Sequence, residues 1–414
     1  MTLKPAYFFK LYKEGKYLLF INVIEQFFFF LVFLVFARKY SVETYGELIT
    51  LFTLANVFIT LFNFGFPVFL QREIAISKDK SSMLLSRIFS INILIFFLYF
   101  LLTFVYYRLF YNTISLKLFL VTILPVYLYS NINILNSVLS GLSEYKKQFK
   151  SFINSRIITV LAFLIFALVL NSKLTYLLII YSIGFLYHIT LLIYNIKKIT
   201  GSFFLSFNFT GISGLIKVSL PLGMAVIFNY LYDKIDILLI SEFTDYSRVG
   251  YYNIGYGIYK ASAIAFSFLL ISGLTKVSYL SRSSYAVKLF FRKYSSSLIL
   301  IGIIINIFLF LASEYIIKII YTDKFTDSIL ILRIVSFAVV GLALNNLAGV
   351  TLNGLGLYRE NMYVTLTGLI VNIVLNLIFI PLYGIIAAAI ISVFTEYFIF
   401  CGDYYFIKRF INPE

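Results

Sequence analysis

Seven ionisable side chains interrupt long apolar stretches of this sequence. They are Glu25, Asp233, Lys234, Asp236, Lys260, Arg333 and Glu396. An ionised group near the centre of a membrane-spanning helix costs roughly 2.5–3.5 kcal/mol, so each should face a partner or a wet cavity. Carboxylates in such places bind protons or cations, whereas ammonium and guanidinium groups suit anionic ligands. Because cations and anions are both present, the set alone leaves the charge of a ligand open.

Lys260 and Arg333 are the cations that best suit an anionic ligand. Lys260 lies on a stretch crowded with tyrosines, of which Tyr256 and Tyr259 are the nearest. Their rings either stack on sugars or fill a helix interface. Glu25 and Asp233 are the carboxylates that we select for proton or sodium coupling. The alternative for all these charges is a structural role between helices.

The chain offers little for catalysis. With one His and one Cys it has no metal-ligand cluster, and it contains no phosphate-binding Gly-x-x-x-x-Gly-Lys-[Ser/Thr] loop. A membrane glycosyltransferase or polysaccharide polymerase needs carboxylates on a sizeable outer loop, but here they are scattered, as at Glu43, Glu242 and Asp323. We therefore expect a protein that is not an enzyme and has no cofactor or metal.

The composition indicates a polytopic membrane protein. Of 414 residues, 61% are hydrophobic and 13% are charged, mean hydropathy is +0.95 and net charge is +16. These values argue against a soluble enzyme, a disordered chain and a nucleic-acid-binding module. Continuous apolar runs of about 20 residues predict an all-α protein with twelve transmembrane helices. We place them near 17–37, 46–67, 88–107, 118–140, 152–171, 174–196, 217–241, 250–274, 296–320, 328–353, 362–381 and 384–405.

Basic residues predict the orientation of these helices. About two thirds of the 34 Lys and Arg residues fall on one alternating set of loops, which the positive-inside rule places in the cytoplasm. Both termini belong to that side. The first apolar run lacks a small-residue cleavage site, so we expect it to be retained as the first helix.

An internal repeat predicts two bundles. The segment 139–146, at the end of the fourth span, matches 352–359, at the end of the tenth, and both contain a Gly followed four residues later by Tyr and a basic residue. Six spans separate equivalent elements, so the halves point the same way across the membrane. We therefore predict two parallel six-helix bundles, 1–199 and 200–414, as in rocker-switch transporters.

Three segments, in the correct order on these spans, resemble the polysaccharide-biosynthesis flippases of the multidrug/oligosaccharidyl-lipid/polysaccharide exporter superfamily. They are YGELITLFTLANVFITLFNFG (45–65), SLPLGMAVIFNYLYDKIDILLIS (219–241) and NIVLNLIFIPLYGIIAAAI (372–390). The positions that match the family pattern are Gly46, Gly65, Asp236, Asn376, Pro381 and Gly384. One departure is Glu242, where the family usually has Gly.

The resemblance implies flipping of an undecaprenyl-diphosphate-linked oligosaccharide to the outer leaflet of a bacterial or archaeal cytoplasmic membrane. That lipid-linked oligosaccharide, the bilayer and a polysaccharide polymerase are then the expected partners. On this hypothesis Arg72, Arg87 and Arg156 face the cytoplasm and collect the diphosphate, while Lys260 and Arg333 hold it as the bundles rock. A drug or organic-cation exporter of the same superfamily is the alternative, with Glu25 and Asp233 lining its cavity.

Overall fold

The computed structural model describes residues 5–201, 205, 212–270 and 273–411, and all its regular elements are helical. In the first half, these are α1 (Pro5–Lys39), α2 (Val42–Phe62), α3 (Phe66–Ile76), a 3₁₀ turn (Lys78–Lys80), α4 (Ser81–Phe110), α5 (Leu116–Gly141), α6 (Tyr145–Leu164), a π turn (Ile165–Val169) and α7 (Leu174–Thr200). In the second half, these are α8 (Ile212–Phe243), α9 (Tyr246–Ala261), α10 (Ala263–Leu270), α11 (Gly273–Leu280), α12 (Ser284–Tyr321), a 3₁₀ turn (Asp323–Phe325), α13 (Ser328–Ser336), α14 (Ala338–Gly354) and α15 (Tyr358–Ile411).

Most of the predicted spans correspond to a membrane-length helix. Nine apolar helices among the described residues are long enough to cross a bilayer, and two further pairs of helices qualify when each is taken as one bent span. The bent pairs are Ile212–Pro221 with Gly223–Phe243, at 60°, and Ser328–Ser336 with Ala338–Gly354, at 49°. The protein is thus a multi-pass membrane protein, and eleven of the twelve predicted spans have a counterpart.

The predicted span at 250–274 has no such counterpart. Helix α9 ends at Ala261, and the Ser262 hydroxyl donates a hydrogen bond to the carbonyl of Tyr259 at 2.6 Å where α10 is about to begin. Residues 271 and 272 of that span lie outside the described residues. Within the described residues, the apolar run therefore folds as two short helices, α9 and α10, with a one-residue interruption at Ser262.

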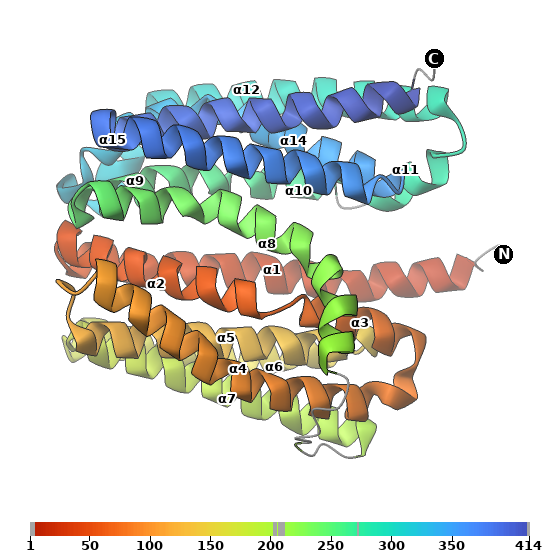
Figure 1. Ribbon diagram of the computed structural model, residues 1–414, viewed down its shortest axis with the longest axis horizontal. Coiled ribbons are helices and arrows are strands. Elements are labelled where there is room, and N and C mark those ends of the chain that lie inside the picture. The colour runs from red at the N-terminus through yellow and green to blue at the C-terminus, as the bar shows by residue number, and fades with distance from the viewer. Residues whose placement is uncertain (1–4, 202–204, 206–211, 271–272, 412–414) are drawn as a thin grey trace. The chain divides into compact units, whose positions relative to one another are not determined.

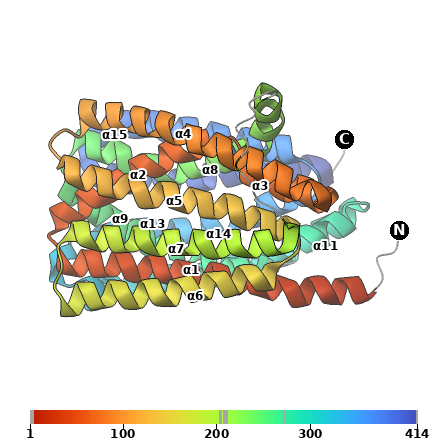
Figure 2. The same cartoon turned by 90° about the horizontal axis from the view of Figure 1, so that it is seen from below.

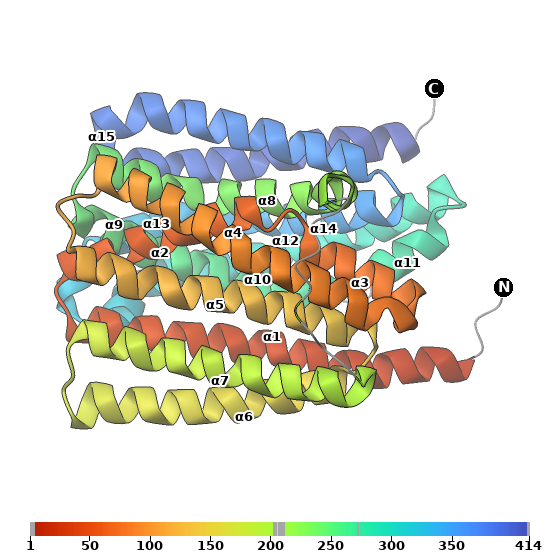
Figure 3. The ribbon, with the colours of Figure 1, turned by 60° about the horizontal axis from the view of Figure 1, so that its bottom comes forward.

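The chain divides into two compact units. Unit 1 comprises Met1–Phe36 and Leu51–Ile227, and unit 2 comprises Ala37–Thr50 and Phe228–Glu414. Within unit 1, α7 lies beside α5 in Figure 2 and beside α6 in Figure 3, and it packs against both helices. Helices α1, α2 and α8 each pass from one unit to the other, because the division falls inside them.

Helix α15 is a hairpin of two spans rather than one rod. Its backbone leaves helical geometry at Gly384, where φ is 61°, and the spans on either side are Tyr358–Tyr383 and Ile385–Ile411. The two spans run back along each other (Figure 1), and a Cβ on Gly368 would lie 2.4 Å from the Ile399 side chain. Pro381 precedes the turn by three residues, close to the predicted span end.

Candidate functional site

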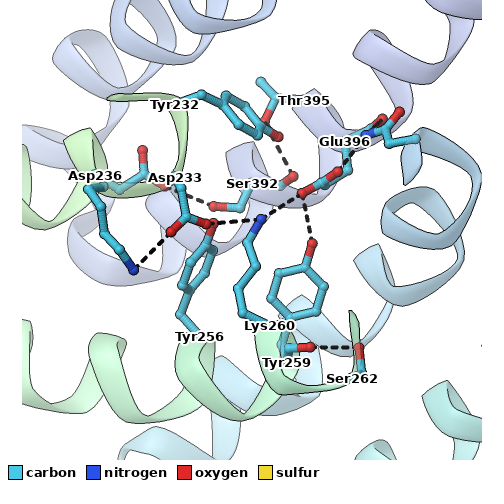
Figure 4. Close-up of polar contacts among 12 residues, drawn as sticks. Tyr232, Asp233, Asp236, Tyr256, Tyr259, Lys260, Ser262, Ser392, Thr395 and Glu396 are labelled. Carbon is cyan, nitrogen blue, oxygen red and sulfur yellow. Dashed lines mark hydrogen bonds and ion pairs between the residues drawn. The ribbon is translucent and has the colours of Figure 1, made fainter. Parts of the chain in front are cut away.

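The charged cluster of unit 2 is centred on Lys260. Its Nζ lies 3.1 Å from Asp233 Oδ1 and 3.1 Å from Glu396 Oε1, so one ammonium bridges two carboxylates (Figure 4). The three residues come from α9, α8 and α15. The sequence selected Lys260 as a cation that suits an anionic ligand, and in the structure two carboxylates contact its ammonium group.

Three tyrosines of α9 distribute hydrogen bonds to three carboxylates. Tyr252 donates to Asp236 at 2.8 Å, Tyr256 to Asp233 at 3.1 Å, and Tyr259 to Glu396 at 2.9 Å. Their spacing of four and three residues places the phenols on one helix face. The rings are buried, so in this structure Tyr256 and Tyr259 hold carboxylates and are not exposed platforms for a sugar.

Asp236 is held by neutral hydrogen-bond donors, whereas Asp233 and Glu396 also contact a lysine. Besides Tyr252, Asp236 accepts hydrogen bonds from Asn376 Nδ2 at 2.8 Å and Ser392 Oγ at 3.0 Å. The amide of Asn376 also donates to Asn372 Oδ1 at 3.1 Å. Helices α8, α9 and both spans of α15 are therefore joined at one buried carboxylate, which fits the structural role suggested for Asp236 and Asn376.

Carboxylates outnumber ammonium groups in this cluster. Asp233 has a second cation, since Lys234 Nζ lies 2.8 Å from its Oδ2. Glu396 receives Lys260 and the amide of Asn345. The two lysines thus face Asp233, Asp236 and Glu396, and the cluster carries one negative charge when every group is ionised.

Unit 1 contains a separate buried pair. Arg156 Nη2 of α6 lies 3.0 Å from Glu25 Oε1 of α1, and the Arg156 side chain is 2% exposed. The guanidinium carbon lies 4.8, 5.2 and 4.9 Å from the ring centroids of Phe28, Phe152 and Phe185. Arg156 was predicted to face the cytoplasm and collect a diphosphate. In this structure its side chain is buried and already paired with Glu25, so it is not open to a cytoplasmic anion.

A buried histidine lies beside this pair. His188 is 0% exposed and packs edge-on against Phe152, and neither of its ring nitrogens has a hydrogen-bond partner. In Arg156, Nε and Nη1 are likewise buried without a partner. The pair is therefore held chiefly by one ion contact inside an aromatic enclosure.

The other predicted cations lie in three different environments. Arg72 is exposed on α3. Arg87, on α4, has Nε and Nη2 buried without a partner. Arg333, on α13, donates from Nε to Ser313 Oγ at 2.9 Å and lies over the Phe310 ring. Within the described residues, none of these three arginines forms an ion pair with Glu25 or with a carboxylate of the Lys260 cluster.

Asn136 of α5 also has a buried atom without a partner, its Oδ1. Nearby on the same helix, Asn131 accepts a hydrogen bond from Asn92 of α4 at 2.9 Å. Unit 1 therefore contains buried donors and a buried acceptor that lack partners.

Two motif glycines are explained by close approach. A Cβ on Gly46 would lie 1.7 Å from the carbonyl oxygen of Tyr246, so only glycine lets α2 meet the start of α9. Gly65 has φ 74° and would place a Cβ 2.8 Å from the Cα of Gly223. Larger residues at these positions would push apart the backbones of two elements.

Sequence reasoning overlooked Ser392, Thr395 and Asp403. Ser392 binds Asp236, and Thr395 accepts a hydrogen bond from the Tyr232 hydroxyl at 3.2 Å. Both lie within one turn of Glu396, so the helix face that contains Glu396 was the available signal. Asp403, seven residues further on, is buried with Oδ1 unpartnered. Nowhere in the described chain do three His, Cys, Asp or Glu side chains form a potential metal site.

Two family profiles match parts of this sequence. The profile described as "Polysaccharide biosynthesis protein" matches residues 11–275, and the profile described as "MatE" matches residues 221–378. Two uncharacterized membrane proteins of Methanocaldococcus jannaschii are 27% and 24% identical over 220 and 213 residues, which is 52% and 48% of this chain. The matched regions span 50% and 41% of those relatives, so the chain covers half of their length or less.

Solved structures share the fold over almost the whole chain. An inward-facing multidrug resistance MATE family transporter of the MOP superfamily aligns with a TM-score of 0.73 at 12% identity, covering 93% of this chain and 94% of that one. The lipid II flippase MurJ, in an inward closed conformation, aligns at 0.71 and 18% identity, covering 94% and 87%. The Vibrio cholerae MATE transporter VcmN, in a bent form, aligns at 0.62 and 12%, covering 97% and 96%. At these identities the likeness establishes the architecture.

Proposed function

We propose, because this chain belongs to the polysaccharide biosynthesis protein family, that it flips an undecaprenyl-diphosphate-linked oligosaccharide from the cytoplasmic to the outer leaflet of the cytoplasmic membrane. The family match covers well over half of the chain, and the fold is that of MOP-superfamily transporters. The flipped lipid would enter synthesis of O-antigen, capsule or exopolysaccharide, and a polymerase would then receive it.

The observation that best supports an anionic substrate is the lack of hydrogen-bond partners for the buried guanidinium of Arg87. Two of its nitrogens are buried without a hydrogen bond, and no ion pair to it occurs within the described part of the chain. An unsatisfied buried donor costs about 1–3 kcal/mol, and more when it is charged. A phosphate oxygen at this position would satisfy the donors, because guanidinium and phosphate match in charge and geometry.

Lys260 enters this mechanism by exchanging partners. A diphosphate that approaches Lys260 competes with Asp233 and Glu396 for the same ammonium. Asp233 keeps Lys234 at 2.8 Å after the exchange, so releasing Lys260 does not leave that carboxylate without a cation. Arg72, exposed on α3, provides the first contact on the cytoplasmic side, and Arg333 a later one.

Transport then proceeds by alternating access of two bundles, 1–199 and 200–414, with both termini in the cytoplasm. Outward movement of two negative charges gains about 4.6 kcal/mol per 100 mV of inside-negative potential. A proton or Na⁺ that moves inward through Glu25 or Asp233 adds the free energy of its own gradient to this driving force. Its binding at either carboxylate weakens an existing ion pair, which couples ion binding to a change in structure.

Transport by purified protein in vesicles tests the proposal. Arg87→Gln should slow flipping of a fluorescent polyprenyl-diphosphate sugar at least about tenfold, the loss expected for one charged hydrogen bond. Arg87→Lys should retain part of the rate, and Arg108→Gln, an exposed arginine at the far end of α4, should retain all of it. If Arg87→Gln flipped the lipid at the wild-type rate, the guanidinium of Arg87 would have no role in the pathway.

One observation favours a second function, export of organic cations. The carboxylates Asp233, Asp236 and Glu396 outnumber the neighbouring lysines, so the unit 2 cluster attracts positive charge. In the same vesicles, movement of a cationic dye that is abolished by Asp233→Asn, with no flipping of the diphosphate lipid, would establish this function and contradict the flippase.

A further inference from the structure

We infer that the beginning of α12, together with α11, forms a docking surface for anionic phospholipid headgroups. Residues 273–300 contain five cations and no carboxylate. The cations are Lys276, Arg282, Lys288, Arg292 and Lys293, and all five are exposed. None of them forms an ion pair with a carboxylate of the described residues. This surface belongs wholly to unit 2 and is separate from the Lys260 cluster.

The outer face of α12 marks where the hydrocarbon begins. From residue 299 onward, the exposed side chains of this face are apolar for about four turns, and they are Ile299, Leu300, Ile303, Ile304, Ile307, Phe308 and Leu311. Tyr294 precedes this band and Tyr315 follows it. Twenty-one residues of helix span about 32 Å, which equals the hydrocarbon thickness of a bilayer and the usual spacing of its two aromatic belts.

Three cations lie at the level of the headgroups. Arg292 and Lys293 precede the apolar band by six or seven residues, or about 10 Å of helix. Lys276 is brought to the same level from α11, because its Nζ lies 3.5 Å from the Tyr294 hydroxyl and 5.5 Å from that ring's centroid. The headgroup layer on each side of a bilayer is about 5–8 Å thick, and long Lys and Arg side chains extend several ångströms toward it, so phosphates reach all three.

The surface is held in place by packing on its inner side. Phe291 stacks on Tyr404 of α15, with ring centroids 5.8 Å apart, and the Ser284 hydroxyl donates to the carbonyl of Phe410. Phe290 contacts Tyr294 and lies 5.9 Å from Lys276 Nζ. The cations therefore project from a rigid helix pair, and ordering them costs little when a lipid binds.

Continuity with the apolar band selects a lipid over a soluble polyanion. A phospholipid places its phosphate against Lys276, Arg292 and Lys293 while its acyl chains follow Ile299 and Leu300. A soluble polyphosphate would satisfy the cations but leave the adjoining apolar face unused. Each basic residue near an anionic membrane surface strengthens binding by roughly fivefold, so three together should make preference for anionic lipid measurable.

Native mass spectrometry of the full-length protein in detergent tests the inference. The protein is titrated with phosphatidylglycerol or with phosphatidylcholine of the same chain length. Wild type should bind phosphatidylglycerol at least about tenfold more tightly. The triple variant Lys276→Gln, Arg292→Gln, Lys293→Gln should lose that preference, whereas replacing the three residues with the opposite basic residue (Lys276→Arg, Arg292→Lys, Lys293→Arg) should keep it.

A matched control removes the same charge elsewhere. Arg108→Gln, Lys117→Gln and Lys173→Gln alter three exposed cations of unit 1, and this variant should bind as wild type does. Equal affinity of wild type for the two lipids would overturn the inference, as would an unchanged preference in the first triple variant. Loss of preference that inorganic diphosphate reproduces by competition on wild type, with no dependence on acyl chains, would assign the surface to soluble polyanions instead.

Discussion

In unit 1 one guanidinium meets one carboxylate inside an enclosure of phenyl rings, whereas in unit 2 one ammonium lies between two carboxylates among hydroxyl and amide donors. Among the described residues, the ion pair of Arg156 is with Glu25, and no second charged partner replaces it. Asp233 and Glu396 each have a second polar partner, Lys234 and Asn345. Where a charged group has several partners, losing one of them costs little free energy. Where it has one partner, breaking the pair leaves a buried charge uncompensated. We therefore expect unit 1 to depend on its pair for stability and unit 2 to depend on its cluster for transport.

Breaking the unit 1 pair should have the largest effect. Glu25→Gln leaves the buried charge of Arg156 uncompensated, which we expect to lower the free energy of unfolding by about 3–5 kcal/mol. Denaturant unfolding of the protein in mixed micelles measures the loss. Glu25→Leu combined with Arg156→Leu should recover most of it, since no charge remains buried. The exposed pair Glu144–Lys147 supplies the control, because Glu144→Gln should cost less than about 1 kcal/mol.

Removing the shared cation of unit 2 should cost less. Lys260→Met leaves Glu396 with Tyr259 and Asn345, and it leaves Asp233 with Lys234, so we expect a loss of about 2–3 kcal/mol in the same unfolding measurement. The same variant should lose most of its transport rate in vesicles, although its free energy of unfolding falls only by this moderate amount. If Lys260→Met destabilised the protein more than Glu25→Gln, the contrast between the two units would be wrong.

The smallest effect concerns a single phenol. Tyr252→Phe removes one of three donors to Asp236 and should cost about 1.5 kcal/mol, the value of a hydrogen bond to a charged group. Tyr256→Phe removes a donor from Asp233, which keeps two ammonium groups, and should cost less than about 1 kcal/mol. Equal losses in the two variants would show that neighbouring lysines do not substitute for a phenol.

Hydropathy predicted most of the fold because each apolar run folds by itself into one helix or one bent pair. Within the described residues the predicted span at 250–274 is interrupted at Ser262, between α9 and α10, while the hydropathy of the run stays high. The bend between α13 and α14 at Phe337 was equally invisible, since no proline or glycine marks it.

The sequence identified the members of the two charged clusters but not their pairs. Lys260 and Glu396 are 136 residues apart, and Glu25 and Arg156 are 131 apart, so only the packing of distant helices decides which charges meet. The count of cations and anions left the charge of a ligand open, and Lys260 was selected as a cation that suits an anionic ligand. Its actual neutralisation depends on the register of α9 against α15, which no local pattern encodes.

The boundary between the two units falls inside α1, α2 and α8, not in loops. A continuous helix transmits torque along its axis, whereas a flexible loop lets its two ends rotate independently. Each crossing between the units is therefore made of helical backbone, whose hydrogen bonds resist local rotation more than a loop does.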